Sequence, residues 1–311
     1  MPHFLKRRNR RVAPAPESNG DKPKEIPKQP RGRAKTQNLC QQVEWFGFRN
    51  PGNLCYVNSS LQSLITLKGF INDIIMQVEV WKGIAEAQLI RAFINILILH
   101  RSTDAERKCQ AVYVFKCILS KKNPEFQNQG QKDAHEFIVT VLDQLRNLAP
   151  LLRQEAALVG RKYRCPVEEH FIFKMESTRT CKGCGAQSSR DEEFSNLSLN
   201  LVPGASVQDV LQNYLKETDI DFNCGCGAKR SGQQSSFATL PKILMLHLKR
   251  FTYSRPMQLE KLHCAVDVFR ELMVTSRQGD GWYSLVSVVS HLGIKGQQVD
   301  LHNFCTLRHL I

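Results

Sequence analysis

The sequence predicts an α+β protein in which helices come first and strands follow. Apolar residues recur with helical spacing after Cys55 and again over Ala85–His100, Cys109–Lys121 and Lys132–Leu148. Beyond residue 165 the pattern alternates, as it does in half-buried strands. The predicted strands cover Glu169–Glu176, Phe194–Leu201, Ile243–Phe251 and Tyr283–His291. Since helices and strands are not interleaved, we do not expect a regular βαβ repeat.

Each of these elements places its apolar side chains on one face. In the helices these are Leu61, Leu64, Ile65 and Leu67, then Leu89, Phe93, Ile96 and Leu97, and finally Phe137, Val141, Leu142, Leu145 and Leu148. Among the strands, Ile243–Phe251 places Leu244, Leu246 and Leu248 on one side. Such faces predict a packed domain that begins near Glu44.

Composition limits the class of protein. Of the 311 residues, 42% are hydrophobic and 23% charged, which excludes a fully disordered or collagen-like chain. No apolar run approaches the ~18 residues of a membrane span, and the first residues lack the apolar core of a secretory signal. Eleven cysteines without such a signal indicate a reducing compartment, where cysteines serve as metal ligands or nucleophiles more often than as disulfide partners.

Residues 1–43 are predicted to form a disordered basic tail. Residues 1–40 hold eleven Lys/Arg against three acidic residues, in a chain whose formal net charge is +14. A segment of this kind, with several prolines and little apolar periodicity, cannot bury enough surface to offset its ordering entropy. The run Lys6–Arg11 is a candidate nuclear address or contact for an anionic polymer. A solvated linker explains it equally well.

The first segment that indicates chemistry is Gly47–Gln62. A loop containing Pro51 and Gly52 delivers Cys55 to the start of a helix. There the unsatisfied N–H groups and the positive end of the helix dipole favour a thiolate, which is the form that a cysteine nucleophile needs. Asn50, on the same loop, carries an amide that can donate a hydrogen bond to an oxyanion. The alternative is a buried structural cysteine at a helix cap.

This segment resembles the cysteine box of the ubiquitin-specific proteases, Gly-Leu-x-Asn-x-Gly-Asn-Thr-Cys-Tyr-x-Asn-Ser-x-Leu-Gln. The positions that agree are Asn50, Gly52, Asn53, Cys55, Tyr56, Asn58, Leu61 and Gln62. The sequence departs from the box at Phe48 and Leu54. A match of this length is far more specific than a short motif.

Three further segments resemble the same family in the same order. Gln131–Phe137 is similar to its Gln-Gln-Asp-Ala-His-Glu-Phe element, Leu240–Phe251 to its core strand, and Tyr283–Gly293 to the strand that leads to its catalytic histidine. The resemblance therefore covers roughly residues 45–295. It implies a papain-like cysteine protease fold with a helical thumb and a palm and fingers built from strands, whose active-site cleft lies between thumb and palm.

The resemblance also implies roles for single residues. Cys55 would be the nucleophile and Asn50 would help to hold the oxyanion. Asp133 matches the aspartate that binds the ubiquitin tail, with Gln131 beside it as a second substrate-binding candidate. For Asp133 the alternative is a helix cap. His135 and His247 are predicted to be structural.

Two short-spaced cysteine pairs form a second constellation. Cys181 and Cys184 are followed, after 39 intervening residues, by Cys224 and Cys226, with glycines in the turns. Four thiolates suit a tetrahedral zinc ion that is structural, because no coordination position stays open for water. Many members of the resembled family carry a zinc ribbon at this place. The alternative is two pairs of free or partly buried cysteines.

The pattern breaks near the end of the chain. A cysteine protease needs a base beside the nucleophile and a group that orients this base. In the family the base is the histidine of a Gly-His-Tyr motif that follows the histidine matched by His291. The sequence holds no such motif, and Gly296–Gln298 places glutamine where the base is expected. Three explanations stay open, namely a truncated or altered C-terminal end, a catalytically inactive relative, and His302 acting as the base.

The same gap predicts a structural defect. If the sheet lacks its closing strands, Tyr283–Gly293 becomes an edge with unpaired backbone groups, and such an edge invites aggregation. We therefore expect marginal solubility.

The sequence thus predicts a ubiquitin-specific protease catalytic domain over residues 44–295, followed by a divergent tail over 296–311. Its expected activity is removal of ubiquitin from protein conjugates, with a catalytically inactive ubiquitin-binding protein as the alternative. Structural Zn²⁺ is the expected cofactor, and catalysis would use none. The expected partners are ubiquitin and ubiquitinated proteins, without a membrane and without nucleic acid beyond non-specific contacts of the basic tail. The expected location is the nucleus, the cytoplasm or both.

Overall fold

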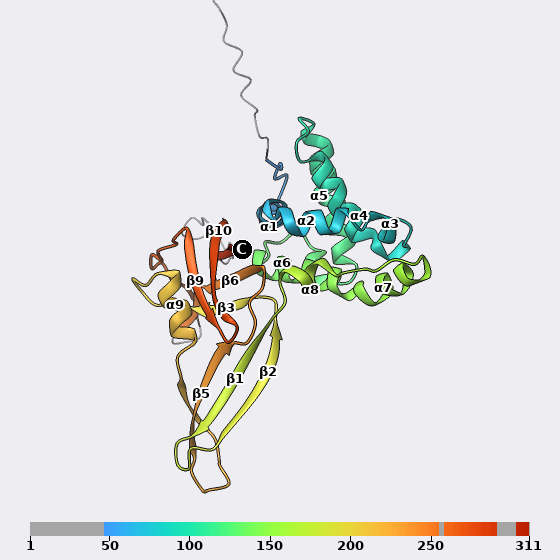
Figure 1. Ribbon diagram of the computed structural model, residues 1–311. Helices are drawn as coiled ribbons and strands as arrows, with labels where there is room; N and C mark the ends of the chain where they lie inside the picture. Colours follow the sequence, from blue (N-terminus) through green and yellow to red (C-terminus); the bar gives the residue numbers. More distant parts are fainter. Residues whose placement is uncertain (1–46, 255–257, 291–302, 311) are drawn as a thin grey trace, which may run out of the picture. The chain divides into compact units, whose positions relative to one another are not determined.

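Figure 1 shows the computed structural model, which describes residues 47–254, 258–290 and 303–310. All of these residues belong to one compact unit. Helices occupy its first half and strands its second, which confirms the α+β class. The predicted basic tail, residues 1–43, lies outside the described residues.

The helices follow one another from residue 55 to residue 170, with one more between the strands. They are α1 (Cys55–Thr66), α2 (Lys68–Ile75), α3 (Val78–Trp81), α4 (Gln88–Leu99), α5 (Ala105–Ser120), α6 (Ala134–Asn147), α7 (Ala149–Leu158), α8 (Pro166–His170) and α9 (Val207–Tyr214). Short 3-10 helices cover Ala85–Ala87 and Pro124–Phe126. In the part of the chain that the structure describes, none of these helices combines the length and apolar character needed to cross a bilayer.

Most strands form one mixed sheet. They are β1 (Phe173–Cys181), β2 (Gln187–Phe194), β3 (Leu197–Asn200), β4 (Thr218–Asp221), β5 (Arg230–Phe237), β6 (Ile243–Lys249), β9 (Glu271–Ser276), β10 (Gly279–Val289) and β11 (Asn303–Leu310). Their order is β2-β1-β5-β9-β10-β11-β6-β3, with β4 paired to β5. The strands β7 (Phe251–Ser254) and β8 (Gln258–Lys261) form a separate hairpin.

All four predicted strands have different bounds in the structure. The last of them, predicted over Tyr283–His291, corresponds to β10, which starts at Gly279 and ends at Val289. Glu169 lies in α8, because Pro166 starts a helix there, and the strand begins only at Phe173. The range Phe194–Leu201 is divided between the end of β2 and β3. The predicted strand Ile243–Phe251 is interrupted after Lys249, so that Phe251 starts β7.

The predicted exposed edge at Tyr283–Gly293 is wrong for the part of it that the structure describes. β11 pairs antiparallel with β10 on one side and with β6 on the other, so β10 is an interior strand. The prediction failed because it treated the segment after residue 296 as unrelated to the sheet. His291, Gly296–Gln298 and His302 lie outside the described residues.

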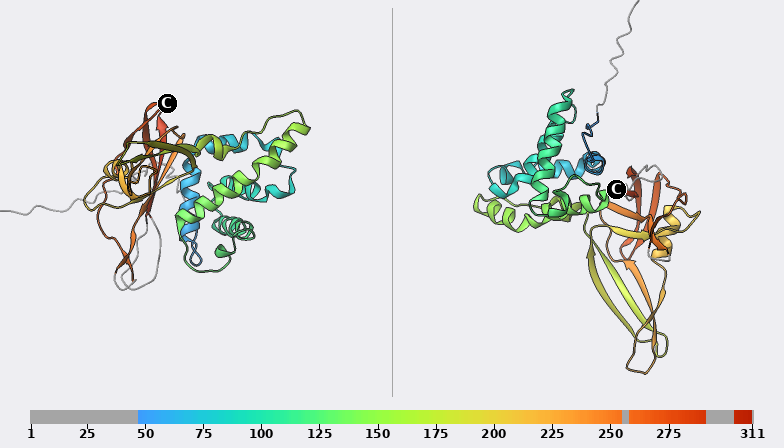
Figure 2. Two further views of the ribbon diagram at one scale, coloured as in Figure 1. Left: turned by 90° about the horizontal axis from the view of Figure 1, so that it is seen from below. Right: turned by 180° about the vertical axis from the view of Figure 1, so that it is seen from behind.

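Two hydrophobic cores meet at β6. One core belongs to the helices and includes Ile243 and Met245, whereas the other belongs to the sheet and includes Leu244, Leu246 and Leu248. Successive side chains of a strand point to opposite faces, so β6 packs into one core with one face and into the second core with the other. In Figures 1 and 2 the helices α2–α8 gather in one group, while β1, β2 and β5 extend beyond the rest of the sheet as fingers. α9 packs on the sheet through Val207, Val210 and Leu211.

Candidate active site

Cys55 is the first residue of α1, as the sequence predicted, and it is half-buried. The loop before it is closed by two side-chain amides. Asn50 Oδ1 accepts a hydrogen bond from the Leu54 N–H at 2.9 Å, and Asn58 Nδ2 donates to the Arg49 carbonyl at 3.1 Å. Because the oxygen of Asn50 is engaged, its nitrogen is the end of the amide that can face a ligand. That end is the donor which the predicted oxyanion role requires.

Gln131 contacts the cysteine directly. The Cys55 thiol donates a hydrogen bond to Gln131 Oε1 at 3.0 Å, although 76 residues separate the two. Gln131 Nε2 donates to Asn53 Oδ1 at 2.8 Å, and Asn53 Nδ2 donates to the Gln129 carbonyl at 2.8 Å. Gln131 was predicted to bind substrate. The structure adds that it belongs to the surroundings of the thiol.

Sequence reasoning gave Asn53 no role. The structure shows it in a left-handed backbone conformation, with φ of 51°, which asparagine tolerates better than most residues. This conformation goes together with a side chain that bridges the cysteine loop and the segment before α6. Asparagine between Gly52 and Leu54 was the signal that could have pointed to such a turn.

Asp133 is the N-cap of α6. Its carboxylate accepts a hydrogen bond from the His135 N–H at 2.7 Å, so the capping alternative is confirmed. The role of Asp133 in binding a ubiquitin tail stays a prediction. Ligand atoms of Asp133, His135 and His247 lie within 4.8 Å of one another. The two imidazoles are stacked, however, with centroids 3.9 Å apart and planes 14° apart, so one metal ion cannot lie in both ring planes.

Four of the described histidines form hydrogen bonds with residues other than Cys55. His100 contacts Gln62, and His170 contacts Asp73 at 2.7 Å. His247 bonds to the hydroxyl of Ser198, which places it as a structural residue of the sheet. Within the described ranges, the recorded partner of the Cys55 thiol is the Gln131 amide oxygen, and an amide oxygen is no base at neutral pH. His291 and His302 lie outside these ranges.

Tyr56, next to the cysteine, is fully buried, and its hydroxyl finds no hydrogen-bond partner among the described residues. Burial raises the pKa of Tyr56 to about 12. An unpaired buried hydroxyl is unfavourable, so we expect Tyr56→Phe to raise the free energy of unfolding by about 1 kcal/mol. Urea unfolding would measure this, with Tyr56→Leu as a control that loses the packing on Phe126 and Phe137. A less stable phenylalanine variant would contradict the expectation.

The four predicted metal ligands come together at the end of the fingers. The sulfurs of Cys181, Cys184, Cys224 and Cys226 all lie within 4.8 Å of one another. The Cys181–Cys226 and Cys184–Cys224 sulfur distances are 3.6 and 3.8 Å. Hydrogen bonds from backbone N–H groups, first that of Cys184 and then that of Gly183, lower the pKa of Cys181 to about 6. These four residues can therefore hold a metal ion.

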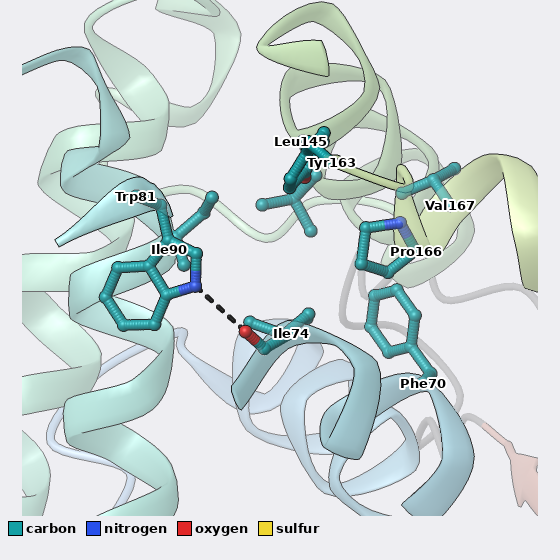
Figure 3. A pocket seen from close by; sticks show the side chains of 8 residues that line it. All are labelled: Phe70, Ile74, Trp81, Ile90, Leu145, Tyr163, Pro166 and Val167. Atoms are coloured by element: carbon teal, nitrogen blue, oxygen red, sulfur yellow. Dashed lines mark hydrogen bonds between the residues drawn. The ribbon is translucent and has the colours of Figure 1, made fainter. Parts of the chain in front are cut away.

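A pocket among the helices is too small to be a second ligand site. Figure 3 shows its lining, which is apolar and includes Phe70, Ile74, Trp81 and Tyr163. The cavity has a volume of about 10 Å³, roughly the space of one water molecule. Its polar contact is internal, because the Trp81 indole N–H donates to the Ile74 carbonyl at 2.8 Å. This cavity is a packing feature of the helical core.

A known protein family matches most of the described chain. The family described as ubiquitin carboxyl-terminal hydrolase matches residues 46–303, which include the cysteine loop, Gln131, Asp133 and the four-cysteine cluster. The chain belongs to this family. The predicted family is thereby confirmed.

Named relatives of this chain are longer proteins. Mouse ubiquitin carboxyl-terminal hydrolase 37 is 33% identical over 267 residues, a match that covers 79% of this chain and 27% of the relative. Mouse ubiquitin carboxyl-terminal hydrolase 29 is 29% identical over 251 residues, covering 76% of this chain and 29% of the relative. The chain thus spans between a quarter and a third of the length of these relatives.

A solved structure supports the fold of this chain. The chain matches the Ubp8/Sgf11/Sus1/Sgf73 DUB module of SAGA bound to ubiquitin aldehyde with a TM-score of 0.70 at 20% identity. The match covers 85% of this chain and 69% of the other. The fold is therefore shared, which confirms the predicted papain-like architecture.

Proposed function

We propose that this domain is a thiol-dependent hydrolase that removes ubiquitin from protein conjugates, with Cys55 as its nucleophile. The observation that carries the proposal is the position of Cys55. In a chain of this family it starts a helix, has the Asn50 amide on its own loop and contacts Gln131 from the segment before α6. Asp133, two residues further along that segment, supplies a carboxylate for a basic peptide tail.

The proposed reaction has two steps. The Cys55 thiolate attacks the carbonyl carbon of the last glycine of ubiquitin, so that a carbon–sulfur bond forms and the carbon–nitrogen bond to the conjugate breaks. The amine leaves with the proton that the thiol released. Water then hydrolyses the thioester, which frees the ubiquitin carboxylate and restores the thiol. Asn50 would stabilise the oxyanion in both steps.

A second candidate function is ubiquitin binding without cleavage. Two observations favour it, namely the missing Gly-His-Tyr motif and the amide oxygen that the Cys55 thiol contacts in place of a base. In this case Asp133 and the fingers would hold ubiquitin, and the thiol would stay idle.

One experiment separates the two candidates. The chain is incubated with ubiquitin that carries a C-terminal electrophile, the labelled residue is identified by peptide mass spectrometry, and turnover of a fluorogenic ubiquitin substrate is measured in parallel. Labelling of Cys55 together with turnover supports the hydrolase, and both should vanish in Cys55→Ala but persist in Cys109→Ala. Ubiquitin binding without turnover supports the second candidate. If the chain shows neither ubiquitin binding nor labelling of Cys55, both candidate functions are overturned.

We also propose that the ion held by the four cysteines is zinc. A tetrahedral site with Zn–S bonds of about 2.3 Å places its sulfurs about 3.8 Å apart. The recorded sulfur distances of 3.6 Å for Cys181–Cys226 and 3.8 Å for Cys184–Cys224 fit this spacing. Zinc there would tie the tips of the fingers together and take no part in catalysis.

Gly183 offers a matched test of the zinc site. A Cβ at Gly183 would lie 2.7 Å from Ala228 Cβ and 3.4 Å from Cys226 Sγ, whereas a Cβ at Gly225 meets nothing within 4 Å. We expect Gly183→Ala to weaken zinc binding by about tenfold or more, as substitutions that displace ligands do, and Gly225→Ala to leave it nearly unchanged. Competition with a chromophoric chelator measures both. Equal affinities in the two variants would contradict the prediction.

We propose that the protein works in the nucleus, the cytoplasm or both. The unpaired cysteines of the described residues and the basic run Lys6–Arg11 support this proposal. A fluorescent fusion would test it, with Lys6, Arg7 and Arg8 replaced by alanine. Unchanged nuclear signal in that variant would remove the nuclear address.

A further inference from the structure

The hydrogen bonds around Cys55 have a fixed direction. The chain of contacts ends on the backbone carbonyl of Gln129, and a carbonyl can only accept. Asn53 must therefore turn its Nδ2 toward this carbonyl, at 2.8 Å, and its Oδ1 toward Gln131. Gln131 in turn faces Asn53 with Nε2, at 2.8 Å, and Cys55 with Oε1, at 3.0 Å. The Cys55 sulfur, the last group in this series of hydrogen bonds, therefore has to be a donor, and only a protonated thiol is one.

The Gln129 carbonyl, at the fixed end of this series of hydrogen bonds, belongs to a segment that is anchored in the helical core. Lys116, on α5, is only 5% exposed, and its Nζ donates to the Asn128 carbonyl at 2.8 Å. Asn128 Oδ1 accepts from the Gly130 N–H at 3.0 Å, which folds the turn between them. The buried ammonium and this turn hold the segment so that the Gln129 carbonyl faces Asn53.

We propose that Asn53 and Gln131 are positioning residues which hold Cys55 as a thiol in the ligand-free domain. A thiolate and the Gln131 oxygen would both be acceptors, with no hydrogen between them. This contact therefore has to open before the sulfur attacks. The amide pair thus opposes the start of α1, whose dipole favours the thiolate. The inference deepens the proposed function, since it concerns the same sulfur, but its test needs no ubiquitin.

The test is alkylation of the intact chain by iodoacetamide, followed at Cys55 by peptide mass spectrometry with Cys109 as the internal reference. Gln131→Met keeps the size of the side chain and removes the acceptor. Asn53→Gly removes the amide and keeps the left-handed backbone, which glycine adopts freely. At pH 7 we expect both variants to react about three- to tenfold faster than the wild type, the ratio that one hydrogen bond supports. Gln62→Ala, an amide on α1 outside the chain of contacts, should leave the rate unchanged.

The pH dependence distinguishes this effect from simple access to the sulfur. Because the amide pair acts on the protonated sulfur, the gain should disappear at about pH 10, whereas a gain caused by a loosened loop would persist. Arg49, Tyr56, Lys132 and Asp133, the titratable residues on the two segments that meet at Cys55, are the same in all variants. Rates equal to or below the wild type at pH 7, or a gain that persists at pH 10, would overturn the proposal. Failure of the ubiquitin electrophile to label Cys55 would instead remove the proposed function and leave this result standing.

Discussion

Removing residues 303–311 is expected to abolish the folded sheet. β11 pairs with Trp282–Val289 of β10 on one side and with Ile243–Leu248 of β6 on the other. Without it the sheet divides into two parts, and two apolar strands each gain an open edge. At about 1 kcal/mol for each net hydrogen bond, the loss approaches the whole stability of a domain, which is about 5–15 kcal/mol. Size-exclusion chromatography and circular dichroism should show aggregation and no cooperative transition.

A substitution that keeps the length of the chain tests the same strand. Thr306 pairs with Ser287 on one side and with Met245 on the other. Thr306→Pro removes a ladder donor from a strand that is paired on both edges, and we expect it to lower the melting temperature strongly. Thr306→Val keeps the backbone donor and is the control. A truncated chain that elutes as a monomer and melts at an unchanged temperature would show that β11 contributes nothing.

Replacing Cys181 with serine is expected to unfold the fingers. None of the eight residues of β2 is buried, so the outer fingers have little apolar packing to hold them. With zinc, four thiolates would supply the missing stability, and structural zinc binding is worth about 10 kcal/mol or more in small peptides. We expect Cys181→Ser to lose the metal and to expose residues 181–231 to rapid proteolysis.

The control for this variant is Cys109→Ser, which changes a cysteine on α5 far from the cluster in sequence. It should keep one zinc per chain and the protease resistance of the wild type. Treatment of the wild type with a strong chelator should reproduce the Cys181→Ser cleavage pattern. If the variant keeps its metal, or if its fingers resist proteolysis without metal, the structural role of zinc is wrong.

The helical half of the fold and the position of Cys55 could be predicted because their signals are local. A loop with Pro51 and Gly52 followed by a helical apolar pattern specifies both the helix and its first residue. The capping role of Asp133 is also local, since it involves the N–H two residues away. These features depend on neighbours within one or two turns of the chain.

The contacts that complete the site could not be predicted because they join distant segments. Gln131 and Cys55 are 76 residues apart, and neither residue carries a signal of the other. β11 was missed for a related reason. The residues Asn303–Leu310 include Arg308 and His309 among apolar ones, which weakens the alternation of a strand, although both of its neighbours in the sheet are strongly apolar.

The position of β6 between the two cores has a consequence for how the domain unfolds. Its odd-numbered side chains, Ile243 and Met245, belong to the helical core, whereas Leu244, Leu246 and Leu248 belong to the core of the sheet. Unfolding of either core would expose one face of β6 and would remove a packing surface from the other core. Calorimetry should therefore record a single endotherm whose van't Hoff and calorimetric enthalpies agree, and the helices should lose their slowest-exchanging amides together with the sheet.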